Sequence, residues 1–362
     1  MYFASEKYRT DKDQPVDMAG EIWYNLCIAS TAEGGRVRTI DELKELEETY
    51  PQIRQDRITG WNHERRGSAL PDVGNSNWIS RAYLDSLLIE TRYMDAVSPT
   101  TDFELYGQSF SSPIMTAALS HLDHFMFPGA AEALAQGAKN AGAVLWYGMA
   151  EDEEIQHLSS ICPQMIEIIK PYADRDLIYK KIAFAEKCGL LAVGIDIDHP
   201  FASDGSPDIV DGHEMAPLRT AELASICQTA SLPVIVKDVL SARDAERCLT
   251  AGADGLVLSH HNNRIEYAVP PLKMLPEIAR LTNGAVPLFV DCEIQTGMDA
   301  FKALSLGAKG VCIGRPLMTA IKQNGAAGAA DYLIRANNEL KKAMAYTGCA
   351  DLGKMDASII HC

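Results

Sequence analysis

Eight short apolar runs alternate with longer amphipathic stretches from residue 113 onward. They are rich in Val, Ile and Ala and cover residues 113–119, 143–148, 164–170, 190–196, 233–239, 255–261, 287–292 and 310–315. Apolar strands separated by helices are typical of a parallel sheet that is buried on both faces. Eight near-regular units favour a closed barrel over the alternative, a doubly wound open sheet. The sequence therefore predicts an α/β fold of the (β/α)8 TIM-barrel type.

The stretches between the runs have the length of helices. Candidate helices cover residues 130–142, 175–189, 241–253 and 298–308, and each ends at or near a glycine that can serve as a C-cap. A barrel of this type uses about 250 residues, whereas the chain has 362. The stretches 17–29 and 40–50 resemble helices, while 61–77 is broken by Gly, Pro, Asn and Ser. We predict an irregular, partly helical extension over 1–110, packed on a barrel that occupies 111–362 and ends in a helix.

Composition limits the kinds of molecule that we expect the protein to bind and the cellular compartment in which we expect it. The chain has 33 Lys and Arg against 49 Asp and Glu, a net charge of −16, which argues against binding nucleic acid or an anionic membrane. Its nine cysteines show no CxxC pair or metal-ligand spacing, as expected for reduced thiols. The amino-terminal residues are polar, and no stretch of 18 apolar residues occurs. We therefore expect a cytoplasmic protein.

Polar side chains collect at the ends of the predicted strands. They are Lys170, Asp196, Lys237, His260, His261, Asp291 and Arg315, together with Gly314. In a TIM barrel the chemistry takes place at the carboxyl ends of the strands, where the following loops meet. We therefore predict the active site at this edge.

The end of the sixth strand carries a base and a cation. His261 has a side chain that can take a proton from a hydroxyl or a carbon acid near neutral pH. Arg264 can hold a carboxylate through two parallel hydrogen bonds. Asp196, at the end of the fourth strand, can orient His261 and stabilise its imidazolium.

Lys237 lies almost inside an apolar strand, where an ammonium group needs an anionic partner. That partner could be an electron-rich cofactor ring, a phosphate or a Schiff-base carbonyl. A salt bridge to the adjacent Asp238 is the structural alternative.

Metal-ligand residue types also occur at this edge, namely His260, His261, Asp196 and Asp198. Neighbouring histidines on a strand point to opposite faces and do not easily share one ion. We predict no metal site.

The loops after the seventh and eighth strands are the usual phosphate site of this fold. Gly314 allows the backbone to approach a ligand closely, Arg315 supplies charge, and the next helix offers backbone N–H groups. The sequence predicts that a phosphorylated cofactor or substrate binds here.

Two segments, 232–264 and 290–318, resemble the FMN-dependent α-hydroxy acid oxidase and dehydrogenase family, and the tail 343–356 is similar to its closing helix. The family pattern has a VKG strand, then SNHGGR, DGGIRxG and GRP. The resemblance implies a flavoprotein that oxidises a small 2-hydroxy acid to the 2-oxo acid and passes electrons from FMN to an acceptor. It also implies a homotetramer.

The resemblance assigns a role to each matching residue. His261 would be the base, which either takes the proton of the C2 hydroxyl as hydride passes to flavin N5 or acts in a carbanion route. Arg264 would bind the substrate carboxylate, and Asp196 would pair with His261. Lys237 would stabilise negative charge at the N1/O2 edge of the flavin. The implied cofactor-binding residues are Ala117, Ala118, Lys237, Ser259, Asp291, Gly314 and Arg315.

Several positions depart from the family pattern. Asn262, Asn263, Cys292 and Glu293 replace glycines, His260 replaces Asn, and Gln295 replaces Arg. Lys170 or Ile169 occupies the place of a substrate-contacting tyrosine, and the family's second arginine has no counterpart. We hypothesise that Lys170 replaces part of the lost substrate contacts, and that the excursion 197–230 acts as a lid. An FMN barrel with an isomerase or reductase activity, or a non-catalytic flavin-binding barrel, stays open as an alternative.

Overall fold

The computed structural model describes residues 74–361. The stretches 17–29 and 40–50, and residues 61–73 of the irregular segment, lie outside the described residues. The predicted boundary between residues 110 and 111 stays a prediction.

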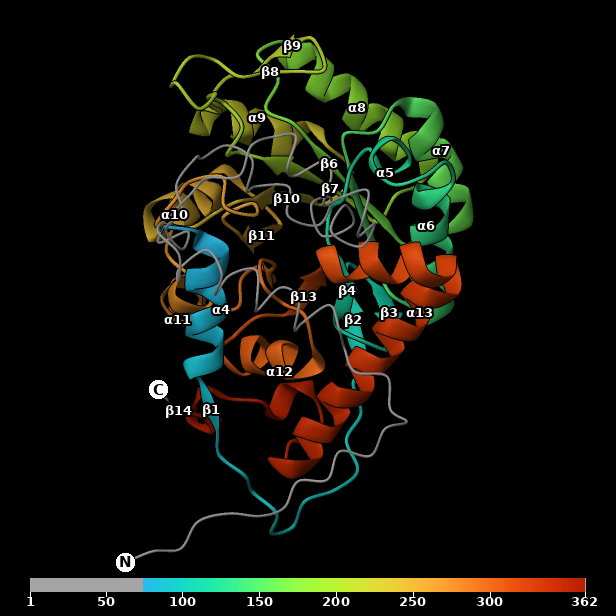
Figure 1. Ribbon diagram of the computed structural model, residues 1–362. Coiled ribbons are helices and arrows are strands. Elements are labelled where there is room, and N and C mark those ends of the chain that lie inside the picture. The colour runs from blue at the N-terminus through green and yellow to red at the C-terminus, as the bar shows by residue number, and fades with distance from the viewer. Residues whose placement is uncertain (1–73, 362) are drawn as a thin grey trace, which may run out of the picture. The chain divides into compact units, whose positions relative to one another are not determined.

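A parallel sheet of eight strands forms the centre of the described residues, in the order β4-β13-β12-β11-β10-β7-β6-β5 (Figure 1). Its strands are β4 (Ile114–Thr116), β5 (Leu145–Gly148), β6 (Met165–Ile169), β7 (Ala192–Asp196), β10 (Val234–Lys237), β11 (Gly255–Leu258), β12 (Leu288–Val290) and β13 (Gly310–Ile313). Each strand lies within one of the apolar runs. The TIM-barrel prediction is confirmed.

The first and last strands of this order meet through Thr116. Its backbone N–H donates to Val144 O at 3.2 Å, and its hydroxyl accepts from Trp146 N at 2.8 Å. A parallel bridge joins Leu119 to Tyr147 just beyond. A β-branched hydroxyl residue therefore continues the ladder across the seam between β4 and β5.

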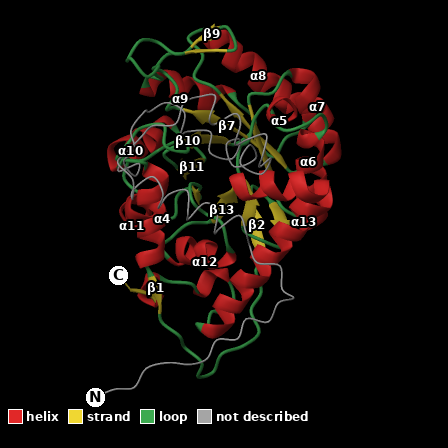
Figure 2. Ribbon diagram, in the orientation of Figure 1, coloured by secondary structure: helices red, strands yellow, loops and turns green. Residues whose placement is uncertain are grey.

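Helices surround the strands (Figure 2). They are α4 (Ser76–Ser86), α5 (Leu122–Phe125), α6 (Ala130–Ala141), α7 (Asp152–Ile161), α8 (Arg175–Cys188), α9 (Thr220–Thr229), α10 (Ala242–Ala251), α11 (Pro271–Thr282), α12 (Gly297–Ser305) and α13 (Arg315–Tyr346). Three end at glycines in the left-handed region, Gly142, Gly189 and Gly252, as C-cap chemistry predicts. Helix α13 is interrupted by non-helical backbone at Asn324 and Gly325.

A hairpin of β2 (Phe103–Leu105) and β3 (Gln108–Phe110) packs against the amino end of the barrel. Its aromatic and leucine side chains join the inward-facing side chains of the strands in one buried cluster. The Tyr106 hydroxyl donates to Asp254 O, immediately before β11, at 3.0 Å. This end is therefore filled, which leaves the carboxyl edge for chemistry.

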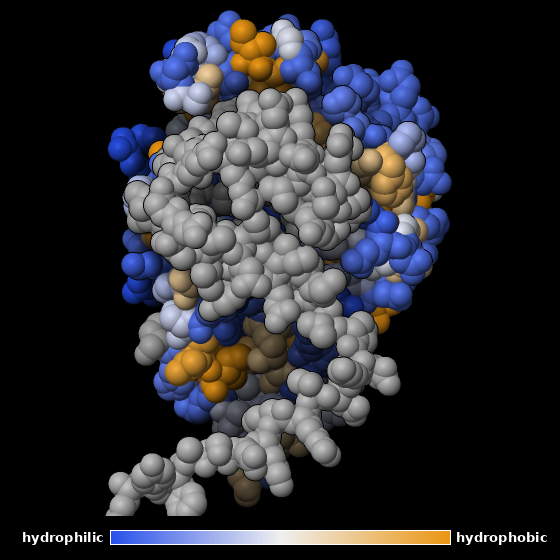
Figure 3. Space-filling model, viewed as in Figure 1, coloured by the Kyte–Doolittle hydropathy of each residue, from blue (hydrophilic) through white to orange (hydrophobic). Residues whose placement is uncertain are grey.

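The predicted excursion after β7 contains a small hairpin of β8 (Ile209–Val210) and β9 (His213–Glu214), followed by α9. Figure 3 shows a hydrophobic patch over this hairpin, where Ile209 is 69% exposed. Near the C-terminus, short 3-10 turns at Leu352–Lys354 and Ala357–Ile359 precede β14 (Ile360–His361), which pairs with β1 (Leu88–Ile89). Within residues 74–361, none of the helices combines the length and apolarity that crossing a bilayer requires.

Candidate active site

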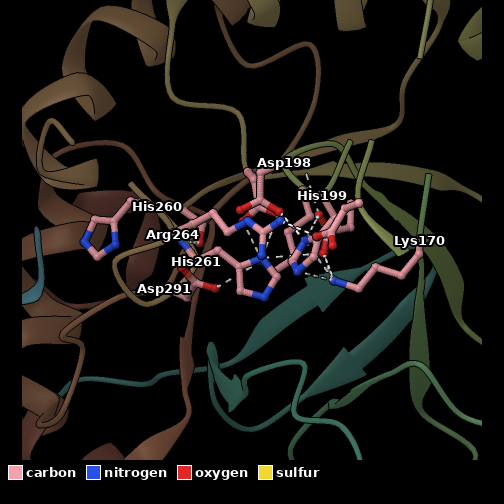
Figure 4. A network of polar contacts seen from close by, with 12 residues as sticks. Lys170, Asp198, His199, His260, His261, Arg264 and Asp291 are labelled. Carbon is pink, nitrogen blue, oxygen red and sulfur yellow. Dashed lines mark hydrogen bonds and ion pairs between the residues drawn. The ribbon is translucent and has the colours of Figure 1, made fainter. Parts of the chain in front are cut away.

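The register of the parallel ladder brings charged side chains to one level at the carboxyl edge. Asp196 pairs with Lys237 across β7 and β10. Ile169 pairs with Ile195 across β6 and β7, so the next residues, Lys170 and Asp196, also lie side by side. Figure 4 shows Lys170 and His261 pointing into one polar network from different strand ends. The predicted gathering of these side chains is what the structure shows.

His261 is the centre of this network. Its Nδ1 lies 3.0 Å from Asp198 Oδ1, 3.3 Å from Asp238 Oδ2 and 3.5 Å from Asp196 Oδ2. Asp196, the expected partner, is thus the most distant of the three carboxylates. The side chain is 29% exposed, and within residues 74–361 no hydrogen bond is made by Nε2. Nδ1 is therefore anchored, and Nε2 can meet a substrate.

The three carboxylates set the protonation of His261. Burial and the neighbouring Lys237 would lower its pKa, but Asp238, Asp196 and the hydrogen bond to Asp198 outweigh them and raise that pKa to about 9. Burial raises the pKa of Asp238 to about 6 against the lowering effect of Lys237, because Asp196 and Asp198 add repulsion. At neutral pH the imidazole is therefore mostly charged.

Lys170 forms a buried ion pair with Asp196. Its ammonium lies 2.5 Å from Asp196 Oδ2 and 3.0 Å from His199 Nδ1. Burial of Asp196 opposes its ionisation, but Lys170 first and His261 next hold the pKa of that carboxyl well below its usual range. Lys170 thus neutralises the buried carboxylate of Asp196.

His199 is a residue that the sequence reasoning missed. Ligand atoms of Asp196, Asp198, His199 and His261 lie within 4.8 Å of one another, a set that could hold a cation. The Lys170 ammonium already contacts this set. His260 lies apart, with Nε2 2.9 Å from Ser80 Oγ, so the two neighbouring histidines diverge as predicted (Figure 4).

Lys237 forms a salt bridge with Asp238, which is the structural alternative that the sequence analysis left open. Its Nζ lies 2.5 Å from Asp238 Oδ1 and 4.0 Å from Asp291 Oδ2, and the residue is 4% exposed. Burial would lower the pKa of Lys237, but Asp238 and Asp291 hold it well above its usual value. Lys237 Nζ also lies 3.5 Å from His261 Nδ1, which places a buried cation beside the imidazole.

Arg264 is bound by the excursion. Its Nη2 lies 2.5 Å from Asp208 Oδ2 and donates to Phe201 O at 2.8 Å. A substrate carboxylate would have to replace Asp208 to reach it.

The predicted cofactor-binding residues lie around the same edge. Ala117 and Ala118 follow β4 and are half-buried, and Ser259 Oγ accepts from the His261 N–H at 3.0 Å. A Cβ built at Gly314 would lie 3.3 Å from Ala117 Cβ. Asp291 Oδ1 accepts from the Cys292 thiol at 3.0 Å.

At the end of β13, Arg315 forms an ion pair with Glu293. Glu293 also accepts from Gln295 Nε2 at 2.8 Å. The cation predicted to bind phosphate therefore contacts a carboxylate of the same chain.

Several residues in the loops of this edge have positive φ angles although they are not glycines. Asp238, Asn262, Asn263, Cys292 and Glu293 all have φ between 55° and 72°, and all occupy glycine positions of the family pattern. Asn and Asp tolerate this conformation better than other side chains, which are disfavoured by about 1–2 kcal/mol. Strain of this kind is typical of functional sites.

An eight-stranded parallel barrel with an imidazole, two buried ammonium groups and a guanidinium at the carboxyl ends of its strands is a site of the kind that TIM-barrel enzymes use. The family model for FMN-dependent dehydrogenases matches residues 75–220 and 204–362. The chain belongs to the FMN-dependent dehydrogenase family, whose members are oxidoreductases that use FMN.

Two curated relatives and one solved structure illustrate the similarity. L-lactate oxidase of Lactobacillus jensenii is 30% identical over 297 residues, covering 70% of this chain and 69% of the relative. Glycolate oxidase of Spinacia oleracea is 26% identical over 325 residues, covering 79% and 86%. A mandelate oxidase variant solved with 2-hydroxy-phenylacetamide superimposes with a TM-score of 0.72 at 25% identity, covering 80% of this chain and 90% of that one.

The residues present fit most of an FMN molecule. Lys237 offers a buried cation for the electron-rich edge of the ring, and Ala117 and Ala118 are small enough to lie against a flat ring. Gly314 keeps a close backbone approach, since a side chain there would be crowded by Ala117. The phosphate end fits less well, because Glu293 holds Arg315.

Proposed function

We propose that this chain oxidises a small 2-hydroxy acid to the corresponding 2-oxo acid, with His261 as the general base. The observation that carries the proposal is the 3.5 Å separation of Lys237 Nζ and His261 Nδ1 at the carboxyl edge of the barrel. The relatives named as lactate and glycolate oxidases support this substrate class.

The base acts through Nε2. His261 Nε2 takes the C2-hydroxyl proton, while Nδ1 stays anchored to Asp198, Asp238 and Asp196. These carboxylates stabilise the imidazolium that forms. FMN, when bound, supplies the acceptor for the hydride from C2. Lys237 opposes the negative charge that accumulates beside it.

Arg264 and Lys170 serve the substrate in different ways. Arg264 binds the substrate carboxylate after releasing Asp208, an exchange of one carboxylate for another that conserves charge. Lys170 keeps Asp196 neutralised, so that the site does not repel an anionic substrate. The reduced protein then passes electrons to oxygen or another acceptor.

We propose that the protein assembles as a homotetramer.

Anaerobic mixing of the flavin-loaded protein with glycolate, lactate and mandelate tests the proposal. The expected result is loss of the oxidised flavin absorbance with at least one acid and formation of its 2-oxo acid. The matching 2-oxo acids serve as controls that cannot donate hydride. Bound flavin that keeps its absorbance with every 2-hydroxy acid would contradict the proposal and favour a different flavin reaction.

A further inference from the structure

We propose that Glu293 occupies the subsite for the cofactor phosphate, so that this chain binds riboflavin about as tightly as FMN. The inference rests on the flavin site of the proposed function and concerns its selectivity for the flavin. The subsite lies where β12 and β13 end, which is the usual phosphate position in a TIM barrel.

Both carboxylate oxygens of Glu293 are engaged by donors of this subsite. Oε1 forms an ion pair with Nη2 of Arg315, which is the first residue of α13. Oε2 accepts from Gln295 Nε2 at 2.8 Å. The Glu293 side chain is only 7% exposed. An incoming phosphate would therefore have to displace a buried carboxylate from the guanidinium that it needs.

Charge also disfavours the phosphate. A phosphate monoester carries about −1.5 to −2 charges at pH 7. Arg315 and Glu293 cancel each other, so this ion pair offers no net positive charge to a phosphate. Riboflavin ends in a hydroxyl in place of the phosphate, and a hydroxyl can donate a hydrogen bond to a carboxylate. The subsite therefore suits the uncharged end of riboflavin.

The backbone that carries Glu293 has a conformation that suits glycine. Cys292 and Glu293 both have φ of 64°, in the left-handed region that glycine adopts most readily. A glycine could therefore take this conformation at residue 293, and the carboxylate is what the Glu293 side chain adds.

Dissociation constants of riboflavin and FMN for the flavin-free full chain, measured by flavin fluorescence quenching, test the inference. Glu293→Gln removes the charge and keeps the size. Glu293→Gly removes the side chain and relaxes the positive φ. Glu277→Gln, an exposed glutamate of α11, is the matched control. Thermal unfolding of each variant confirms that it folds.

The wild type and the Glu277→Gln control should prefer FMN by less than about ten-fold, which corresponds to 1.4 kcal/mol. Both Glu293 variants should raise the preference for FMN at least about ten-fold over wild type. A larger wild-type preference for FMN, or a preference that neither Glu293 variant raises, would overturn the inference and leave the proposed oxidation intact. Failure of the wild type to bind either flavin would overturn both.

Discussion

Asp238 bridges the imidazole of His261 and the buried ammonium of Lys237. Its Oδ2 lies 3.3 Å from His261 Nδ1, and its Oδ1 lies 2.5 Å from Lys237 Nζ. The family pattern has a glycine at this position, so the link is a feature of this chain. Because Asp238 stabilises the charged imidazole, the proposed role of His261 as a base predicts an activity that rises toward alkaline pH.

Substitution Asp238→Asn should move the pH profile of kcat/KM toward acid. In the wild type the raised pKa of His261, about 9, means that the free base and the rate rise about ten-fold per pH unit below that value. Removing one carboxylate lowers the pKa of His261, so the rise should end at least about one unit lower. Asn tolerates the φ of 72° at this position. An unshifted profile would show that Asp238 does not act on the base.

Substitution Lys170→Met should destabilise the fold strongly. It leaves the carboxylate of Asp196, which is 1% exposed, without its cation, and breaking such a pair costs about 3–5 kcal/mol. The double variant Lys170→Met/Asp196→Asn should recover most of this loss. Denaturant unfolding measures both, with the exposed Lys180→Met as control. Equal stabilities of the single and double variants would refute the pairing.

Glu167 of β6 should make the stability of the folded protein depend on pH. Burial raises the pKa of Glu167 from 4.5 to about 7, with Lys181 opposing and Asp152 adding to the rise. The folded state therefore binds this proton more tightly, and the unfolding free energy falls between pH 4.5 and pH 7, by about 3 kcal/mol. Glu167→Gln should remove this fall, unlike the exposed Glu153→Gln. If both variants kept the wild-type pH dependence, Glu167 would not be its source.

Substitution Asp208→Asn should tighten substrate binding. It weakens the ion pair that competes for Arg264, and a half-exposed pair of this kind contributes up to about 1 kcal/mol. KM for a 2-hydroxy acid should fall about two- to five-fold with kcat unchanged. Asp204→Asn, on the exposed part of the same excursion, is the control. An unchanged KM would mean that Arg264 only tethers the excursion.

The barrel could be predicted because each buried strand leaves a local signal. Alternation of side chains along a strand likewise predicted that His260 and His261 diverge, and they do. Both residues lie beyond the end of β11 at Leu258, however, so the loop and not the strand sets their directions. The partners of these groups could not be predicted, since they depend on how loops fold back. His199 and Asp208 both lie in the excursion after β7, which has no periodic pattern.

Asp238 and Glu293 show a second limit on what could be predicted from the sequence. Each stands at a glycine position of the family pattern, and the structure keeps the positive φ with a charged side chain added. The resemblance describes the backbone at these positions well. It does not describe the ion pairs with Lys237 and Arg315, because those belong to side chains that the pattern lacks.

The role of His261 as the base is tested by the rate of flavin reduction in the anaerobic half-reaction at pH 9, compared between wild type and His261→Asn. We expect fast bleaching by a 2-hydroxy acid in the wild type and a loss of about 10²–10⁴-fold in the variant, with flavin affinity unchanged. Bleaching of the His261→Asn protein at the wild-type rate would contradict this role.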